Sequence, residues 1–226
     1  MRLSPVAIIR ETKEAFNKIA PHFSDTRSFV WADLKPLAAY AKEKDRVLDI
    51  GCGNGRLYQL FKDASVFYAG IDYSEALIQI AKQKFPQTQF VVAEMRKLPF
   101  LDHEFNVIFC IAVFHHLPTP ETRVQALREM KRVLKPGGKI ILTNWNLLGD
   151  WAKKKYGEGD HANFVIPWKD AKRKIMAERF YHAFTPDEIA LLCKKAGLKV
   201  EELYYTKKGE RSDDRKGENL VTVISP

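Results

Sequence analysis

The sequence predicts an α/β fold in which a mostly parallel sheet is covered by helices on both faces. Two observations predict it: short apolar runs alternate with amphipathic segments from residue 45 onward, and a glycine-rich turn follows the first run. Short apolar strands separated by helices are typical of parallel sheets. The 226 residues suffice for one well-cored domain with a modest insertion, so we expect a single domain over residues 1–226.

Residues 1–44 are expected to form a helical cap ahead of the sheet. Phe16 and Ile19 fall on one face of a helical segment over residues 11–43. The stretch 21–28 begins with a proline and is expected to break this helix.

Residues 45–145 carry the alternating pattern and are expected to form the core of the sheet. The apolar runs expected to be strands are 46–50, 66–71, 89–93, 105–111 and 139–145. The segments expected to be helices are 57–61, 74–85 and 121–138, the last of which runs into a Lys-Pro-Gly-Gly turn.

The remaining chain divides into an insertion and a regular end. Residues 146–184 are polar, aromatic and basic without a clear period, so we expect an insertion after strand five. Residues 185–226 begin with Thr185-Pro186-Asp187-Glu188, a predicted capping box, and their helix is expected to stop at Gly197. Strands over 198–205 and 220–224, joined by a charged loop, complete a predicted seven-stranded sheet.

The glycine-rich turn predicts a ligand site. Gly51, Gly53 and Gly55 follow the first strand, and glycines there let a ligand approach the main chain. Their spacing differs from the G-x-G-x-x-G of dinucleotide enzymes, which disfavours a nicotinamide-binding domain.

Acidic residues stand at the ends of the first three strands. Asp49 precedes the glycines, and Asp72 ends the second strand, where an acid accepts hydrogen bonds from ribose hydroxyls. Glu94 ends the third strand, where its side chain and the amide of Met95 can bind an adenine edge. The pattern therefore predicts a cofactor that contains a nucleoside.

This combination, with LPF at 98–100 and KPGG before the fifth strand, resembles the class I S-adenosylmethionine-dependent methyltransferases over about residues 45–145. The resemblance implies a Rossmann-like fold, S-adenosylmethionine as cofactor and S-adenosylhomocysteine as product. It places Asp49, Gly51 and Gly53 at the methionine moiety, Asp72 at the ribose, and Glu94 with Met95 at adenine. The full set of implied cofactor-binding residues is Asp49, Gly51, Gly53, Asp72, Tyr73, Glu94, Met95 and Ile111.

Other segments resemble one family within this class, the tRNA wobble-uridine methyltransferases that esterify a carboxymethyl group at uridine C5. They are 20–31, 111–117, 143–145 with 164–168, and 178–189. The resemblance implies tRNA as a partner and also a small zinc-binding activator subunit, although the chain itself offers no expected metal site. It departs from the family in lacking the long low-complexity insertion of some relatives and paired tryptophans in the final strand.

The chemistry can be considered independently of this resemblance. Methyl transfer from a sulfonium is an in-line displacement, and a carboxylate nucleophile is ionised at neutral pH, so it needs no base. Arg27 is the first candidate for a clamp on the carboxylate, followed by His22 and His116. An amine or phenol would need a proton acceptor, for which His115 or His116 is the candidate.

Charge and aromatic residues favour an RNA substrate. The net charge is +9, and residues 152–174 alone carry +4. We expect the substrate to be bound by cations and by aromatic side chains that stack on a base. The candidate substrate-binding residues are His22, Trp31, Trp145, Lys153, Lys154, Lys155, Trp168 and Tyr181.

Two other functions remain open at this stage. A small-molecule methyltransferase, acting on a quinone precursor or a metabolite, would use the histidine pair as a base. A non-catalytic partner subunit would keep the fold alone, but the intact Asp49, Asp72 and glycines argue against it.

The chain is expected to be cytoplasmic. Its N-terminus has no long apolar run, and no stretch approaches the length of a membrane span. Cys52, Cys110 and Cys193 are scattered singly, which suits a reducing compartment.

Overall fold

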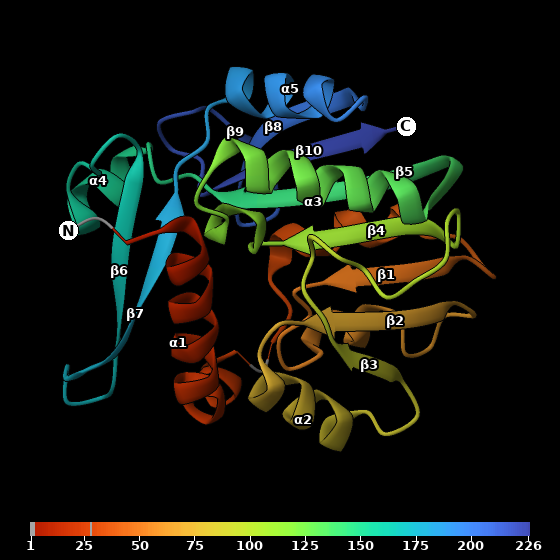
Figure 1. The fold of residues 1–226 in the computed structure, drawn as a ribbon, viewed down its shortest axis with the longest axis horizontal. Helices are drawn as coiled ribbons and strands as arrows, with labels where there is room; N and C mark the ends of the chain where they lie inside the picture. The colour runs from red at the N-terminus through yellow and green to blue at the C-terminus, as the bar shows by residue number, and fades with distance from the viewer. Residues whose placement is uncertain (1–2, 28) are drawn as a thin grey trace.

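The computed structural model describes residues 3–27 and 29–226. It confirms the predicted α/β fold: a sheet of eight strands runs in the order β3-β2-β1-β4-β5-β10-β8-β9 (Figure 1). The first five strands in this order, from β3 through β2, β1 and β4 to β5, are parallel to one another. Strand β10 is antiparallel to both β5 and β8. The strands are β1 (Arg46–Ile50), β2 (Phe67–Asp72), β3 (Gln89–Val92), β4 (Phe105–Ile111), β5 (Leu134–Trp145), β8 (Lys199–Lys207), β9 (Glu210–Ser212) and β10 (Asn219–Ser225).

The eighth strand is a correction to the predicted count. The charged loop after β8 contains β9, which pairs antiparallel with Tyr205, Thr206 and Lys207. A segment of three residues in a charged loop carries no apolar alternation, so the sequence pattern did not indicate it.

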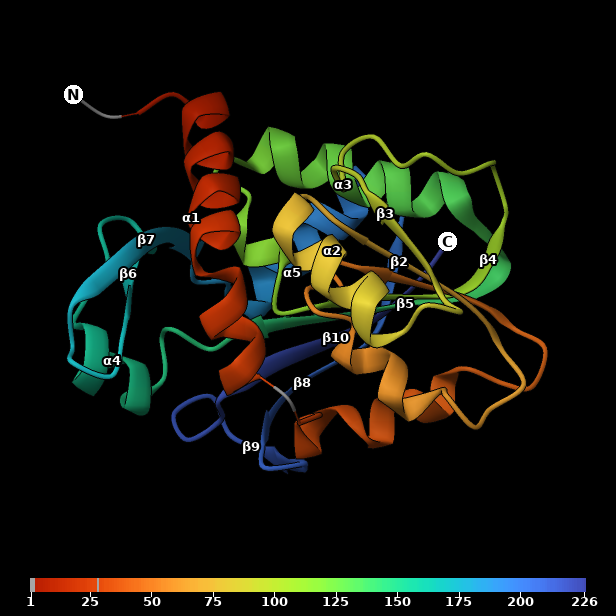
Figure 2. The ribbon, with the colours of Figure 1, turned by 90° about the horizontal axis from the view of Figure 1, so that it is seen from below.

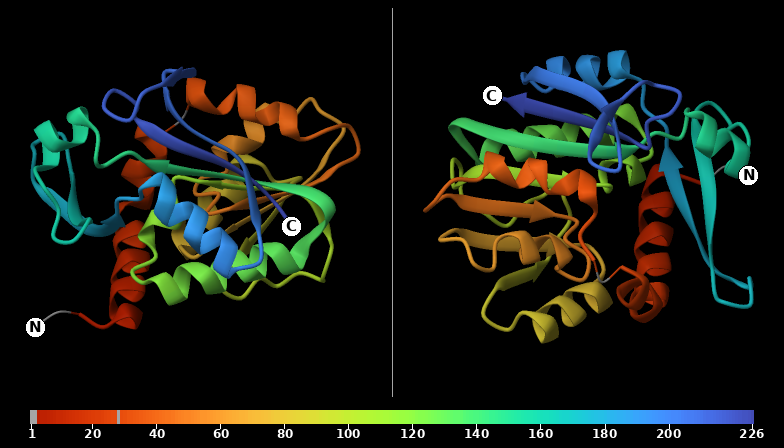
Figure 3. Two further views of the ribbon diagram at one scale, coloured as in Figure 1. Left: turned by 90° about the horizontal axis from the view of Figure 1, so that it is seen from above. Right: turned by 180° about the vertical axis from the view of Figure 1, so that it is seen from behind.

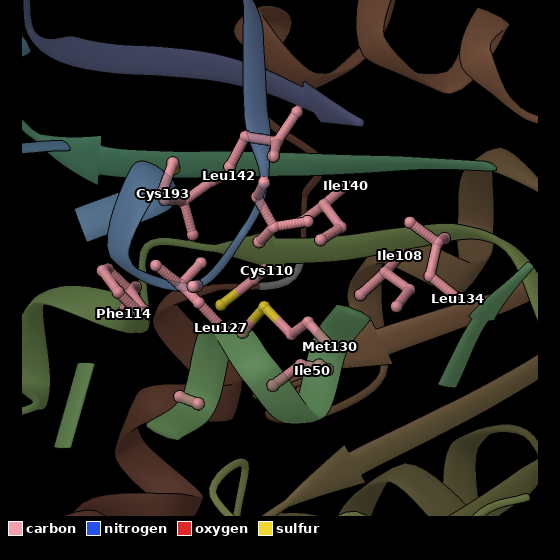
Figure 4. Packing of buried hydrophobic residues seen from close by; sticks show 14 of the residues in the cluster. Ile50, Ile108, Cys110, Phe114, Leu127, Met130, Leu134, Ile140, Leu142 and Cys193 are labelled. Carbon is pink, nitrogen blue, oxygen red and sulfur yellow. The ribbon is translucent and has the colours of Figure 1, made fainter. Parts of the chain in front are cut away.

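Helices α3 (Pro120–Val133) and α5 (Pro186–Lys195) cover one face of the sheet. Figure 4 shows Leu127 and Met130 of α3 packed beside Ile108, Cys110 and other strand residues. Helix α3 is shorter than predicted, because its last residues and the Lys-Pro-Gly-Gly segment already belong to β5.

The other face of the sheet is covered by short helical segments, as the rear view in Figure 3 shows for η1 and η2. They are the 3₁₀ segments η1 (Ala32–Leu34), η2 (Pro36–Tyr40) and η3 (Arg56–Leu60), together with the helix α2 (Glu75–Lys84). Helices on both faces leave the strand ends as the place where a ligand can reach the sheet.

Helix α1 (Pro5–Thr26) stands across the carboxyl ends of the parallel strands (Figures 1 and 2). The predicted break over residues 21–28 is wrong for residues 21–26, because α1 continues through Pro21; residue 28 lies outside the described residues. Ile19 and Ala20 are fully buried, and this packing outweighs the hydrogen bond that a proline removes.

The predicted insertion has regular structure that its sequence concealed. It forms α4 (Asp150–Tyr156) and an antiparallel hairpin of β6 (Asn163–Lys169) and β7 (Ile175–His182), which packs against α1. Phe164, Ile166 and Trp168 alternate inward along β6, but Pro167 within the run argues against a strand in the sequence. A hairpin with two edges tolerates that proline.

One of the two hydrogen bonds of the predicted capping box of α5 is present. Thr185 accepts a hydrogen bond from the Glu188 amide at 3.2 Å, as expected. The Glu188 carboxylate does not return to the cap. It binds Arg123 of α3 and His182 of β7, each at 3.0 Å, and so ties the hairpin to both helices.

The described structure shows the state of the three cysteines and the apolar character of the helices. Cys52, Cys110 and Cys193 are buried free thiols. None of the described helices combines the length and the apolar character that crossing a membrane requires.

Candidate active site

Two adjoining pockets open at the carboxyl ends of the parallel strands, beneath α1. They enclose about 790 Å³ and 580 Å³ and share five lining residues: Phe16, Gly51, Asp72, Val113 and His116. The larger pocket, here called the reaction pocket, extends toward the β6–β7 hairpin. The smaller one, the nucleoside pocket, lies between α1 and the ends of β2 and β3.

The glycine turn forms the floor of both pockets. The amides of Gly51 and Cys52 both donate to the Ile71 carbonyl, at 2.7 and 2.8 Å, which bends the chain sharply after β1. Gly51 has a φ of +72°, and a Cβ atom there would lie 2.3 Å from Val113. The position therefore requires glycine.

Two carboxylates give this end of the site its negative charge. Asp49 accepts a hydrogen bond from the Tyr68 hydroxyl at 2.6 Å, and burial raises its pKa to about 7. Asp72 accepts from the amides of Gly53 (2.9 Å) and Ser74 (2.8 Å), and burial raises its pKa to about 6. Each carboxylate oxygen can accept a further bond, so the pair suits hydroxyl or ammonium donors of a ligand.

The nucleoside pocket collects the other residues predicted to bind the cofactor. Tyr73, Glu94 and Met95 line it, while Ile111 lines the reaction pocket. The Glu94 carboxylate is bound by the Arg96 side chain, so one of its oxygens already has a partner in the protein.

Three arginines give the opposite end of the reaction pocket its positive charge. Arg27 and Arg179 both lie over the Trp168 ring, at 5.3 and 4.9 Å, and Arg56 lies 4.1 Å over Trp31. Burial, followed by the charge of Arg179, lowers the pKa of Arg27. Burial and then the charge of Arg27 lower the pKa of Arg56 to about 10.

These guanidinium groups form no close ion pair in the described part of the chain, although Arg56 lies within electrostatic reach of the Asp49 carboxylate. Across residues 3–27 and 29–226, none of the three forms an ion pair with a carboxylate. Arg179 is 4% exposed and its Nε has no hydrogen-bond partner, nor has Nη1 of Arg56. The buried Arg179 and the half-buried Arg27 and Arg56 therefore favour an anionic ligand between them.

The histidine pair differs from a pair of ordinary bases. His116 lines both pockets and donates from Nδ1 to the Phe180 carbonyl at 2.7 Å, so its Nε2 is unprotonated. Burial lowers its pKa to about 3. His115 lies outside the pocket linings; its Nδ1 accepts from the Trp145 amide at 3.3 Å, and burial lowers its pKa well below the usual range. Both are neutral at physiological pH.

Aromatic walls surround the arginines. Trp145 and Tyr181 stack with centroids 5.2 Å apart and planes 19° apart, and both line the reaction pocket with Trp31 and Trp168. His22, predicted to contact substrate, is not in the lining. Its Nδ1 accepts a hydrogen bond from Trp168 at 2.7 Å, so it positions that tryptophan from behind.

The three predicted lysines lie apart from the reaction pocket. Lys153, Lys154 and Lys155 are exposed on α4. Lys155 lines a neighbouring cleft, and the other two line neither the reaction pocket nor the nucleoside pocket.

Sequence reasoning missed Arg56, Arg179 and Phe16. Arg56 directly follows the glycine turn, and Arg179 precedes Tyr181 by two residues, which is the spacing of side chains on one face of a strand. That alternation was the available signal for Arg179. The helical pattern of the sequence places Phe16 on one face of a helix and gives no sign that it lines both pockets.

Fold and site together define a class of protein, and comparison with known sequences agrees. A family model described as a methyltransferase domain matches residues 48–142. A putative methyltransferase of Encephalitozoon cuniculi is 31% identical over 189 residues, 82% of this chain and 85% of the relative. The chain belongs to the class I S-adenosylmethionine-dependent methyltransferases.

Within this class the chain is homologous to tRNA methyltransferases. The tRNA (carboxymethyluridine(34)-5-O)-methyltransferase of Saccharomyces cerevisiae is 32% identical over 161 residues, 71% of this chain and 57% of the relative. A probable tRNA methyltransferase 9B of Mus musculus is 31% identical over 72% of this chain, which spans about a third of that relative's length (34%).

Solved structures share the fold at lower identity. The CcbJ methyltransferase of Streptomyces caelestis matches with a TM-score of 0.74 at 17% identity, over 95% of this chain and 98% of its own. A chain from the complex between the Haloferax volcanii Trm112 methyltransferase activator and the putative methyltransferase matches with a TM-score of 0.70 at 19% identity, over 95% and 96%. Both place the chain in the Rossmann-like methyltransferase fold.

Proposed function

We propose that this enzyme methylates a carboxylate, namely that of a carboxymethylated wobble uridine in tRNA. The observation that carries the proposal is the pair of guanidinium groups, Arg27 and Arg179, held over one tryptophan without an acidic partner in the described chain. Two adjacent cations, the half-buried Arg27 and the buried Arg179, suit a carboxylate with two oxygens. The relatives named as carboxymethyluridine methyltransferases supply the substrate class.

The residues at the glycine turn fit the cofactor. We assign Asp72 to the ribose hydroxyls, Asp49 with Gly51 and Gly53 to the methionine moiety, and Glu94 with Met95 to adenine. When bound there, S-adenosylmethionine supplies an electrophilic methyl group on a sulfonium. The buried carboxylates match the donors and positive charge of this molecule, as the cationic pocket beyond matches an anionic acceptor.

The remaining work of the protein is alignment. Arg27 and Arg179 orient one carboxylate oxygen toward the methyl group. Trp145, backed by the buried Tyr181 on which it stacks, offers a ring face to the uracil and helps to exclude water. A carboxylate is ionised at neutral pH, so no proton has to move. His116 packs against Phe16 and Tyr181 and acts as a wall of the pocket.

The histidine chemistry gives the first test against the small-molecule alternative. With an ordinary histidine base, the rate of methyl transfer would fall as the pH drops below about 7. Because burial lowers the pKa of His116 to about 3, we expect no such fall from this residue. With saturating cofactor, we expect the rate of single-turnover methyl transfer to be flat between about pH 6 and 9, since neither the carboxylate nor arginine titrates there.

The variant His116→Asn serves the same test, because its amide can still donate to the Phe180 carbonyl. We expect a loss of less than about tenfold, whereas removing a general base costs about 10²–10⁴-fold. A larger loss would support the alternative, in which a histidine base removes a proton from the acceptor. Methyl transfer to the amide analogue of the carboxymethyl group would support it too, because an amide must lose a proton.

The basic surface gives the second test. If Lys153, Lys154 and Lys155 contact phosphates, tRNA affinity falls steeply with salt, and their replacement by alanine reduces the slope by up to about three. Titration of tRNA at several salt concentrations measures it. A matched variant with alanine at Lys194, Lys195 and Lys199, exposed residues of α5 and β8, should keep the wild-type slope. If both variants show the same salt dependence of tRNA affinity, α4 does not contact the RNA.

An activator subunit is the second partner that we propose. The solved complex of a similarly folded chain with an activator supports it, and β3 is an edge strand with Val92 41% exposed. No group of three or more metal-ligating side chains occurs in the described part of this chain, so a zinc ion would belong to the partner. Addition of the activator should raise the rate of methyl transfer by the purified chain.

A further inference from the structure

We infer that an open cleft beside the reaction pocket binds the RNA nucleotide adjacent to the methylated uridine, an inference that rests on the proposed tRNA substrate. The cleft encloses about 920 Å³ and shares Arg27, Trp31 and Trp145 with the reaction pocket. A strand whose uridine occupies the reaction pocket therefore continues directly into the cleft.

Aromatic side chains form one side of this cleft. Trp151 and Tyr156 of α4 lie beside Trp145, with ring centroids 6.1 Å apart for Trp151–Tyr156 and 6.4 Å for Trp145–Trp151. Trp151 and Tyr156 are half-buried and line the cleft, so the exposed parts of their rings can stack on an unpaired base.

The charged residues of the cleft leave a net positive surface. Its lining carries three cations (Arg27, Lys155 and Lys208) and two acids. Of the acids, Glu218 pairs with Lys207 at 3.5 Å, and Asp33 accepts from the Gly209 amide and from Asn219 at 2.9 Å. The cations Lys155 and Lys208 form no ion pair within residues 3–27 and 29–226.

Stacking walls and unpaired cations together match a single-stranded nucleotide. A purely apolar ligand would leave the cations unused, and a base within a duplex could not present its face to the rings. A nucleotide in a loop satisfies both sets of groups, with its base on Trp151 or Tyr156 and its phosphate near Lys155 or Lys208.

The experiment compares three stem-loop RNAs that carry 5-carboxymethyluridine at the wobble position. One has intact neighbours, and the other two have an abasic nucleotide on the 5′ or the 3′ side. With the wild type, we expect one abasic RNA to lower kcat/KM by about 5- to 150-fold, the usual effect of one lost base–aromatic stack.

The variants locate this effect in the cleft. Trp151→Ala should cause a loss of the same size on the intact RNA and no further loss on that abasic RNA, whereas Trp151→Phe should keep most of the rate. Lys194→Ala, on α5, is the control and should behave as the wild type on all three RNAs.

Two results would overturn the inference. If Trp151→Ala lowers kcat/KM equally on intact and abasic RNA, the tryptophan only supports the pocket; if it lowers neither, the cleft is not used. Absence of methyl transfer to any of the RNAs by the wild type, with the activator subunit present, would instead refute the proposed substrate, and the inference with it.

Discussion

Replacing Arg27 or Arg179 with lysine is expected to lower the rate of methyl transfer to the carboxylate by about 10²-fold, the usual effect of misplacing a reacting group by about 1 Å. Each variant keeps a positive charge but loses the planar fork that holds two oxygens and stacks on Trp168. Single-turnover assays with saturating cofactor measure the rate, and calorimetry measures the affinity for S-adenosylhomocysteine, which we expect to hold.

Two controls accompany these variants. Arg173→Lys makes the same change at an exposed residue of the hairpin turn and should leave the rate unchanged. Because Arg179 is buried, thermal unfolding of its variant checks that the fold survives. Rates near the wild-type value in both arginine variants would exclude the clamp, and a loss of cofactor affinity in parallel would move these residues to the cofactor.

Replacing Asp72 with alanine is expected to weaken binding of S-adenosylhomocysteine by about 1.5–3 kcal/mol, the range for a hydrogen bond to a charged group. This corresponds to about 10- to 150-fold in Kd. The variant also removes the acceptor for the Gly53 and Ser74 amides, which hold the glycine turn in place. Asp63→Ala, at an exposed site, is the calorimetric control.

The raised pKa of Asp72 adds a pH dependence with a definite sign. Burial raises this pKa to about 6 in the free protein, and hydrogen bonds from ribose hydroxyls favour the ionised form. The contribution of Asp72 to cofactor affinity is therefore complete above about pH 6 and falls as the pH drops below it, by up to about tenfold per unit. Asp72→Asn, which cannot ionise, should lose this part of the dependence. Asp49, whose pKa burial raises to about 7, adds a separate fall that Asp72→Asn should retain. An unchanged profile would contradict the ribose assignment.

The sequence predicted the sheet core well because burial on both faces produces continuous apolar runs. The strand over 105–111 has the predicted limits, and the glycine turn follows β1 as expected. The prediction failed where tertiary packing overrides local preference. Pro21 and Pro167 both argue against the structure that contains them, yet Pro21 follows the buried Ile19 and Ala20 of α1, and Pro167 lies between buried residues of β6.

The candidate site was predictable where the chain brings its groups together locally. Asp49, the glycines and Asp72 lie on neighbouring strand ends, so their convergence follows from a parallel sheet. The cationic end depends on the approach of β7 to α1, which no local pattern encodes. Only the structure shows that Arg179 shares the Trp168 ring with Arg27 and that His22 binds Trp168 from outside the pocket. Only the structure shows, too, that burial lowers the pKa of His116.

The most direct measurement is mass spectrometry of the nucleosides of carboxymethylated tRNA after incubation with the enzyme and isotope-labelled S-adenosylmethionine. Methylation of the side-chain carboxylate predicts label on the wobble uridine as a methyl ester, which mild alkali releases as labelled methanol while restoring the carboxymethyl nucleoside. Label that stays on a base nitrogen, a ring carbon or a ribose after alkali, or transfer to a small molecule with none to tRNA, would contradict it.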